Sequence, residues 1–197
     1  MRYTIQGADC RLSVAVYNES ATKTLVVLHG MRDHGGSFES LLPVLSDFRV
    51  IIPDLRGHGL SDQNGVYTMM HFAADLLQVF DAFEVQEGYL LGHSLGGHVA
   101  ARFAALFGHR LKGLILVDGF GPPRQDARLP VDQFALMQAA QVQALQQAGP
   151  RRKIMADETV AVARYQASNP GLDRAVVARL VRQGVGPAPE GGVSWRW

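Results

Sequence analysis

The strongest structural signal in this sequence is one short turn, Gly92-His93-Ser94-Leu95-Gly96-Gly97. It follows the apolar run 89–91, which is typical of a buried strand, and precedes a stretch rich in small residues that favours a helix. Glycines on both sides of a serine let strand and helix backbones pass closely, and the strained turn holds the hydroxyl out above the sheet. The turn therefore predicts an accessible Ser94 at the start of a helix.

The sequence around this turn alternates between strand and helix patterns. Continuous apolar runs, typical of strands covered on both faces, lie at 25–28, 50–52, 89–91 and 114–117. Residues 11–17 alternate polar and apolar, as a half-buried strand does. Helical apolar stripes occupy 69–83, behind the N-cap candidate Thr68, and 99–107, which ends at Gly108. This order predicts an α/β fold with a doubly wound, mostly parallel sheet.

The pattern changes near residue 121, where strand-like runs give way to Gln, Ala and Arg. Only helical patterns follow, at 130–147, 157–167 and 172–183. We therefore expect two domains, an α/β core at 1–121 and a small helical cap at 122–197.

Composition limits the class of protein and of partner. The 197 residues are 47% apolar and 19% charged with a net charge of +1, which is typical of a globular protein that binds neither nucleic acid nor a membrane surface. Residues 1–5 lack the apolar core of a signal peptide and Cys10 is the only cysteine, so we expect a cytoplasmic protein. The seven histidines lack metal-ligand spacing, and we expect no metal or cofactor.

A nucleophilic serine needs hydrogen-bond donors for the oxyanion that forms when it attacks a carbonyl. The N–H of Leu95, at the helix start, supplies one donor, and the N–H of Met31, turned inward after Gly30, is the candidate for the second. His29, Gly30 and His93 adjoin this spot and are candidates for substrate contact. His29, at a strand end, has the alternative role of bracing its loop.

The sequence resembles the α/β-hydrolase superfamily, and specifically its capped serine hydrolases. The resemblance rests on three stretches in the right order, which are Leu28-His29-Gly30, Pro53-Asp54-Leu55-Arg56-Gly57-His58-Gly59-Leu60-Ser61 and the turn at 92–97. It implies that Ser94 forms an acyl-enzyme with a small to medium apolar carboxylic ester or related acyl substrate. It also implies that Asp54, Arg56 and His58 brace a loop. Asp118 lies where some members carry the triad acid, and its alternative role is to cap the turn at Gly119.

The sequence departs from that family in its histidines. The family places the triad histidine after the last strand, whereas the only histidines after Ser94 are His98 and His109, on or at the end of the following helix. Among the other histidines, His34, beside the loop that carries Met31, is the best candidate to replace the triad histidine. Residues 191–197 resemble the segment where such caps return to the core, so we expect the C-terminal strands to be missing. The apolar strand 114–117 would then be an unpaired edge that allows a homodimer. A catalytically incomplete remnant that acts as a binding or association module is the alternative function.

Overall fold

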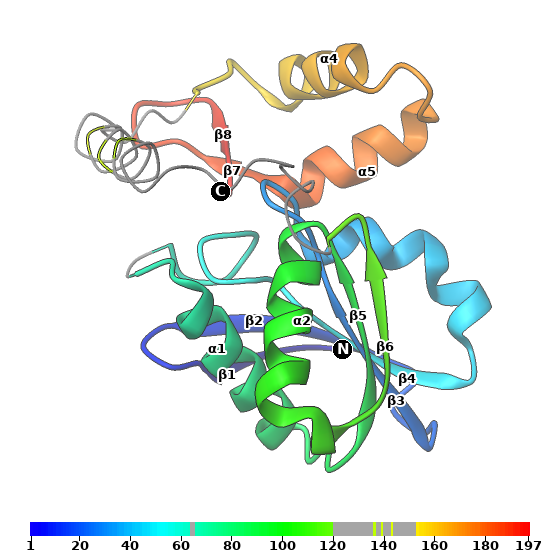
Figure 1. Ribbon diagram of the computed structural model, residues 1–197. Coiled ribbons are helices and arrows are strands. Elements are labelled where there is room, and N and C mark those ends of the chain that lie inside the picture. The colour runs from blue at the N-terminus through cyan, green and yellow to red at the C-terminus, as the bar shows by residue number, and fades with distance from the viewer. Residues whose placement is uncertain (64–65, 120–135, 137–138, 140–142, 144–152) are drawn as a thin grey trace.

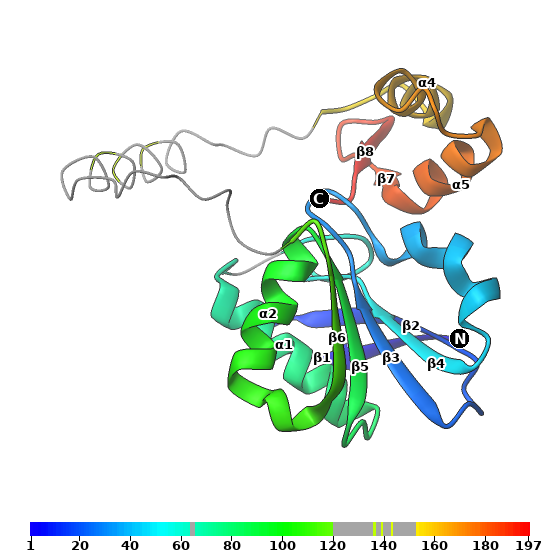
Figure 2. The same ribbon diagram turned by 45° about the vertical axis from the view of Figure 1, so that its right-hand side comes forward.

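The computed structural model describes residues 1–63, 66–119, 136, 139, 143 and 153–197. Figures 1 and 2 show a sheet with helices on both of its faces, and a smaller C-terminal unit, residues 153–197, above one end of the sheet. The predicted helix at 130–147 lies almost wholly outside the described residues, as does the boundary near residue 121. The division into two domains at that boundary therefore stays a prediction.

Six strands form one sheet in the order β1-β2-β4-β3-β5-β6. The strands are β1 (Arg2–Gln6), β2 (Arg11–Tyr17), β3 (Lys23–Leu28), β4 (Phe48–Pro53), β5 (Gly88–His93) and β6 (Leu111–Val117). The four strands β4, β3, β5 and β6 pair in parallel, whereas β1 and β2 pair antiparallel. The mostly parallel sheet is confirmed. The strand β1 was not predicted, because its alternating polar residues lie at an exposed edge and give no continuous apolar run.

Helices cover both faces of the sheet because successive side chains of each central strand point to opposite faces. Val26 and Leu28 belong to the core under α1 (Met69–Ala82) and α2 (Leu95–Phe107). Leu25 and Val27 pack on the other side, against the 3₁₀ helix η1 (Gly35–Leu45). The doubly wound arrangement follows from these continuous apolar strands.

The ends of the two long helices test the predicted caps. The Thr68 hydroxyl accepts a hydrogen bond from the His71 N–H, so the N-cap of α1 is confirmed. Gly108 is at the C-cap of α2, as predicted, but its backbone is right-handed (φ −56°) and the chain continues into a short 3₁₀ helix, η2 (Gly108–Arg110). Gly108 therefore ends the α-helix without the left-handed turn that glycine favours there.

The C-terminal unit contains α4 (Glu158–Ser168), α5 (Arg174–Gly184) and a hairpin of β7 (Val185–Pro187) and β8 (Val193–Trp195). The prediction of helices alone after Pro122 is wrong. Three-residue strands are too short for a periodic signal, and their pairing depends on packing against the helices. Val177, Val181 and Val185 form the core of the unit with Met155 and Ala161.

Polar contacts join the C-terminal unit to the sheet through the loop and 3₁₀ helix that follow β3. Glu39, in η1, pairs with Arg179 of α5 at 2.6 Å and accepts a hydrogen bond from Gln183 at 3.1 Å. The Nε2 of His34 lies 3.0 Å from the Leu180 carbonyl oxygen. The relative position of the two units therefore depends on directed polar contacts.

The edge strand β6 is apolar and partly open to solvent. Leu114, Ile115 and Val117 expose 38%, 48% and 45% of their surface, and β5 is the only described strand paired with β6. Such an edge can pair with another chain, and the predicted homodimer through it stays a prediction. Within the described ranges, no helix has the length and apolar character needed to cross a bilayer.

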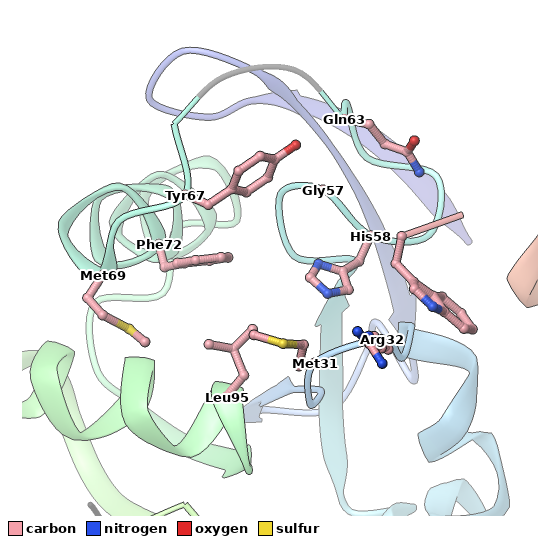
Figure 3. A pocket seen from close by; sticks show the side chains of 10 residues that line it. Met31, Arg32, Gly57, His58, Gln63, Tyr67, Met69, Phe72 and Leu95 are labelled. Atoms are coloured by element: carbon pink, nitrogen blue, oxygen red, sulfur yellow. The ribbon is translucent and has the colours of Figure 1, made fainter. Parts of the chain in front are cut away.

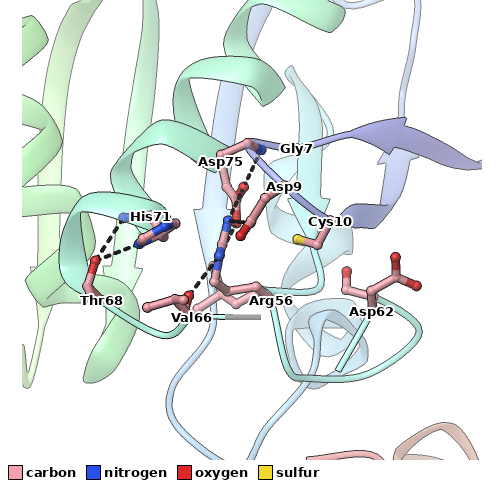
Figure 4. A network of polar contacts seen from close by, with 12 residues as sticks. Gly7, Asp9, Cys10, Arg56, Asp62, Val66, Thr68, His71 and Asp75 are labelled. Carbon is pink, nitrogen blue, oxygen red and sulfur yellow. Dashed lines mark hydrogen bonds and ion pairs between the residues drawn. The ribbon is translucent and has the colours of Figure 1, made fainter. Parts of the chain in front are cut away.

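A buried arginine holds the loop after β4 in place (Figure 4). Arg56 is fully buried and binds Asp75 of α1 through Nε and Nη2, at 2.7 and 2.8 Å. It also pairs with Asp9 at 2.8 Å and donates to the Val66 carbonyl at 2.8 Å. The planar guanidinium thereby joins three chain segments, which supports the bracing role that the resemblance implied.

Replacement of Arg56 by Met should lower the free energy of unfolding by about 3 kcal/mol, because Asp75 would remain buried without its cation. Urea denaturation followed by circular dichroism measures the loss. Arg11→Met is the matched control, since the Arg11–Asp62 ion pair is largely exposed, and it should change stability far less. Equal losses in the two variants would contradict the assigned role of Arg56.

Candidate active site

The turn between β5 and α2 holds Ser94 in a conformation that residues other than glycine rarely adopt. Its φ is 49° and its ψ is −114°. Ser94 is partly exposed, and its backbone N–H donates to the Val117 carbonyl at 2.9 Å. The hydroxyl makes no hydrogen bond to any described residue. Strain of this kind persists only where the surrounding structure fixes it, and it is common at functional sites.

The neighbouring glycines are required because backbones meet at this turn. A Cβ at Gly96 would lie 2.5 Å from the Leu28 carbonyl oxygen, and the Gly96 N–H donates to the His29 carbonyl at 3.1 Å. A Cβ at Gly92 would collide with the Gly96 carbonyl. Only glycine allows this approach between β3, β5 and α2.

The loop after β3 lies against the same turn, as the sequence predicted. A Cβ at Gly30 would be 3.1 Å from His93 Nδ1 and 3.3 Å from Ser94 Cβ. Both Gly30 and His93 are therefore close to Ser94. Their contact with a substrate stays a prediction.

Two backbone N–H groups beside Ser94 have no acceptor among the described residues. Leu95 is the first residue of α2, so its N–H lies ahead of the helical hydrogen-bond ladder. The Met31 N–H, in the loop that passes Ser94, is also unpaired there. Both residues line one cavity. These donors match the predicted pair, and their role as an oxyanion hole stays a prediction.

A cavity of about 540 Å³ opens beside the turn (Figure 3). We call it the elbow cavity; its lining residues are Met31, Arg32, Gly57, His58, Gln63, Tyr67, Met69, Phe72, Leu95 and Trp197. Figure 3 shows the side chains of Met69, Phe72, Leu95 and Met31 around a common space. A space of this size and apolar character suits a small organic molecule.

His58 lies in the wall of the elbow cavity, and the sequence did not predict it there. Its ring is buried, and Nδ1 lies 2.9 Å from the Arg56 carbonyl oxygen, which makes Nδ1 the protonated nitrogen. Nε2 has no hydrogen bond to a described residue, and Figure 3 shows the ring directed into the cavity. Burial lowers the pKa of His58, so the ring is neutral near pH 7. His58 thus braces its loop and offers an acceptor to the cavity.

His29 supports the loop from behind. It has no exposed surface, Nδ1–H donates to the Gly30 carbonyl at 2.8 Å, and Nε2 accepts from the Leu55 N–H at 2.9 Å. Because neither ring nitrogen is free, the contacts support the bracing role and leave no atom for the predicted substrate contact. Burial, followed by the neighbouring His58, lowers the pKa of His29 to about 4.

The remaining members of a catalytic triad are not assembled among the described residues, which include all seven histidines. The backbone N–H of His98 donates to the Ser94 carbonyl at 3.1 Å, but no histidine ring among the described residues hydrogen-bonds to the Ser94 hydroxyl. The substitute base His34 is engaged at both ring nitrogens, by the Leu180 carbonyl and the Gly36 N–H. Asp118 directly follows β6, is exposed and has a φ of 49°. Its role as the triad acid stays a prediction.

Clusters of three or more potential metal ligands are absent from the described part of the chain. Beside the cavity the described residues place a strained serine, two unpaired amides, a neutral histidine and an apolar wall.

Comparison with known proteins places this geometry in context. Residues 23–185 match a family model described as the alpha/beta hydrolase fold. The chain is 34% identical over 110 residues to a "Serine hydrolase-like protein" of Danio rerio, and 37% identical over 98 residues to a protein of that name of Homo sapiens. These alignments cover 54% and 48% of this chain, but only 34% and 48% of the two relatives.

Solved structures share the fold over nearly the whole chain. A hypothetical protein from Pseudomonas aeruginosa aligns with a TM-score of 0.82 and 28% identity, covering 99% of this chain and 69% of that one. The structure titled "Thioesterase Domain From Curacin Biosynthetic Pathway" aligns with a TM-score of 0.84 and 24% identity, covering 100% of this chain and 72% of that one. Both solved proteins are longer than this chain.

The lowered pKa of His29 predicts that stability falls in mild acid. The unfolded chain takes up a proton near the ordinary pKa of 6.5, but the folded chain does so only near 4. This contribution is therefore complete above pH 6.5, and about 2 kcal/mol of it is lost between pH 7.5 and pH 5. Urea denaturation at the two pH values measures it.

His29→Gln should flatten this dependence, whereas His109→Gln, which replaces an exposed histidine, should retain the wild-type dependence. A wild-type slope in the His29 variant would show that other groups cause the acid sensitivity.

Proposed function

The chain belongs to the alpha/beta hydrolase fold family, and on that basis we propose that it is a serine hydrolase that acts on a small to medium apolar carboxylic ester or related acyl compound. The observation that carries this proposal is the strained Ser94 with two unpaired N–H groups beside the elbow cavity. A serine with these neighbours has a place for the oxyanion beside its hydroxyl, and the oxygen becomes nucleophilic when a general base takes its proton.

In the proposed reaction Ser94 Oγ bonds to the carbonyl carbon and its proton passes to a general base. The carbonyl oxygen becomes an oxyanion, which the N–H groups of Leu95 and Met31 stabilise. The bond to the alcohol then breaks, the alcohol leaves with the proton, and an acyl-enzyme remains. Water then attacks the acyl carbon and gives a proton to the same base. The bond to Ser94 Oγ breaks, the carboxylic acid leaves, and the base returns the proton to the serine.

The general base is the part that the described histidines do not supply. In the family pattern it is a histidine held by an acid, and Asp118 is the candidate acid in this sequence. Within the described ranges, none of the seven histidine rings hydrogen-bonds to the Ser94 hydroxyl. An oxyanion hole without a base sustains only residual catalysis, on the order of 10³–10⁴ over water.

This observation favours a second candidate function, a binding module that holds an apolar ligand in the elbow cavity without turnover. The cavity wall does not depend on a base, so binding would persist where catalysis fails. Covalent labelling of the serine separates the two functions.

A fluorophosphonate probe should label the chain at one site, with the label lost in Ser94→Ala, because phosphonylation uses the same oxygen and the same amides as ester attack. Intact-protein mass spectrometry measures the stoichiometry. Ser20→Ala replaces an exposed serine elsewhere and should label as the wild type does. Unlabelled wild-type protein would contradict the hydrolase and favour the binding module.

The hydrolysis of p-nitrophenyl esters should favour chains of medium length, since each methylene buried against the cavity wall adds up to about 0.8 kcal/mol until the cavity is full. The measurement is kcat/KM above the rate of Ser94→Ala, from the acetate to the laurate. Met69→Ala removes part of the cavity wall and should reduce the gain in kcat/KM per methylene. Met70→Ala is the control, since Met70 is exposed and outside the cavity wall, and it should leave this gain unchanged. A rate independent of chain length would contradict binding of the acyl group in this cavity.

A further inference from the structure

A second cavity, of about 510 Å³, lies between the loop after β3 and the C-terminal unit. Its wall includes three cationic and three aromatic side chains, which are Arg32, Lys153, Arg164, Tyr165, Trp195 and Trp197. The charged residues come from the loop after β3, the segment before α4, and α4 itself. We call it the basic cavity.

Three cationic side chains meet at the basic cavity without carboxylate partners. Arg32, Lys153 and Arg164 are exposed, and none forms an ion pair with a described residue. Two arginines of α5 differ in this respect, since Arg179 binds Glu39 and Arg182 binds Glu158. The three unpaired cations therefore give this cavity a positive field.

Asp33 is an acid close to the basic cavity, and its carboxylate is engaged elsewhere. Burial, and then the charge of Asp33, raise the pKa of Tyr165 in the cavity wall. The carboxylate of Asp33 accepts hydrogen bonds from the Ser37 hydroxyl and from the His34 N–H at 2.8 Å. Among the described residues, the wall of the cavity holds three cations and no carboxylate, so the site is positive.

The other wall of the basic cavity is aromatic. Trp195 and Trp197 stack with ring centroids 4.7 Å apart and an interplanar angle of 16°, and Tyr165 lies 5.8 Å from Trp195. Both tryptophans are only partly buried. An exposed aromatic face accepts a planar heterocycle by stacking, while adjacent Arg and Lys side chains accept phosphate.

The two cavities are neighbours because Arg32 and Trp197 line both of them. A ligand with its acyl group in the elbow cavity could therefore place an anionic portion among the three cations. The two cavities together therefore suit a single ligand that has an apolar end and an anionic end.

We propose that the basic cavity binds the phosphorylated carrier of an acyl thioester, a carrier of the coenzyme A class. This assignment of substrate rests on the proposed function. The reaction follows the same course, with Ser94 Oγ bonding to the carbonyl carbon, the carbon–sulfur bond breaking and the thiol leaving with the serine proton. Water then releases the acid, so that thioester and water yield carboxylic acid and thiol.

Intrinsic fluorescence offers a direct test, because the sequence contains two tryptophans and both line this cavity. Coenzyme A should change the tryptophan emission saturably, and the dissociation constant should rise with salt concentration. Pantetheine, which carries the same thiol arm without phosphates or base, should produce no saturable change at the same concentrations. Isothermal titration calorimetry provides a second reading of both affinities.

Charge-removing variants test the assignment of the cations. Arg164→Gln and Lys153→Gln should each weaken coenzyme A binding about three- to tenfold, because each removes a charge-assisted contact at an exposed side chain. Arg174→Gln is the matched control, since Arg174 is exposed on α5 and outside the wall of the basic cavity, and it should bind as the wild type does. Unchanged affinity in the cavity variants, or equal loss in the control, would overturn the proposal.

The test remains informative if the proposed hydrolase function fails. Ser94→Ala should bind coenzyme A with wild-type affinity, because Ser94 is not in the wall of the basic cavity. Binding without fluorophosphonate labelling would retain the basic cavity as an anion site and reject the hydrolase. Labelling without saturable coenzyme A binding would retain the hydrolase and reject the carrier.

Discussion

The close approach of three backbone segments at Gly96 is the constraint on which the site depends. The Gly96 N–H donates to the carbonyl of His29, directly after β3, while the turn from β5 enters α2, and a side chain at Gly96 would collide with the Leu28 carbonyl. Because α2 begins so close to the sheet, Ser94 is the single residue between β5 and α2. The chain must change direction at this residue, which takes a positive φ. The same approach brings the loop after β3 against the serine, so one packing contact sets the positions of the hydroxyl and both amides.

Two buried charged residues in the loop after β4, Asp54 and Arg56, hold that loop in one position beside the site. Arg56 ties the loop to α1, and Asp54 accepts hydrogen bonds from the N–H groups of Gly35 and Leu60 at 2.8 and 3.0 Å. Burial of such groups is costly unless each is fully paired, so loop conformations that break these pairs are disfavoured. That conformation directs the His58 ring into the elbow cavity.

The C-terminal unit adds a different kind of wall to the site. Its own core is small and its contacts with the sheet are largely polar, through Glu39 and His34. Through Trp197 it reaches the elbow cavity, and through Trp195 and α4 it encloses the basic cavity. The sheet therefore supplies the serine and the amides, while the C-terminal unit supplies groups suited to select what reaches them.

The sequence by itself determined the central strands, the two helices beside them and the turn at Ser94, because apolar periodicity and glycine spacing are local properties of the chain. It also placed Gly30, Met31, His93 and Leu95 around one point. Only the tertiary structure decided that His58 faces a cavity, that both nitrogens of His29 are engaged, and that residues 185–195 form a hairpin. It alone brought Arg32, Arg164 and the tryptophans together. Each of these outcomes depends on contacts between residues far apart in the chain, which periodicity does not record.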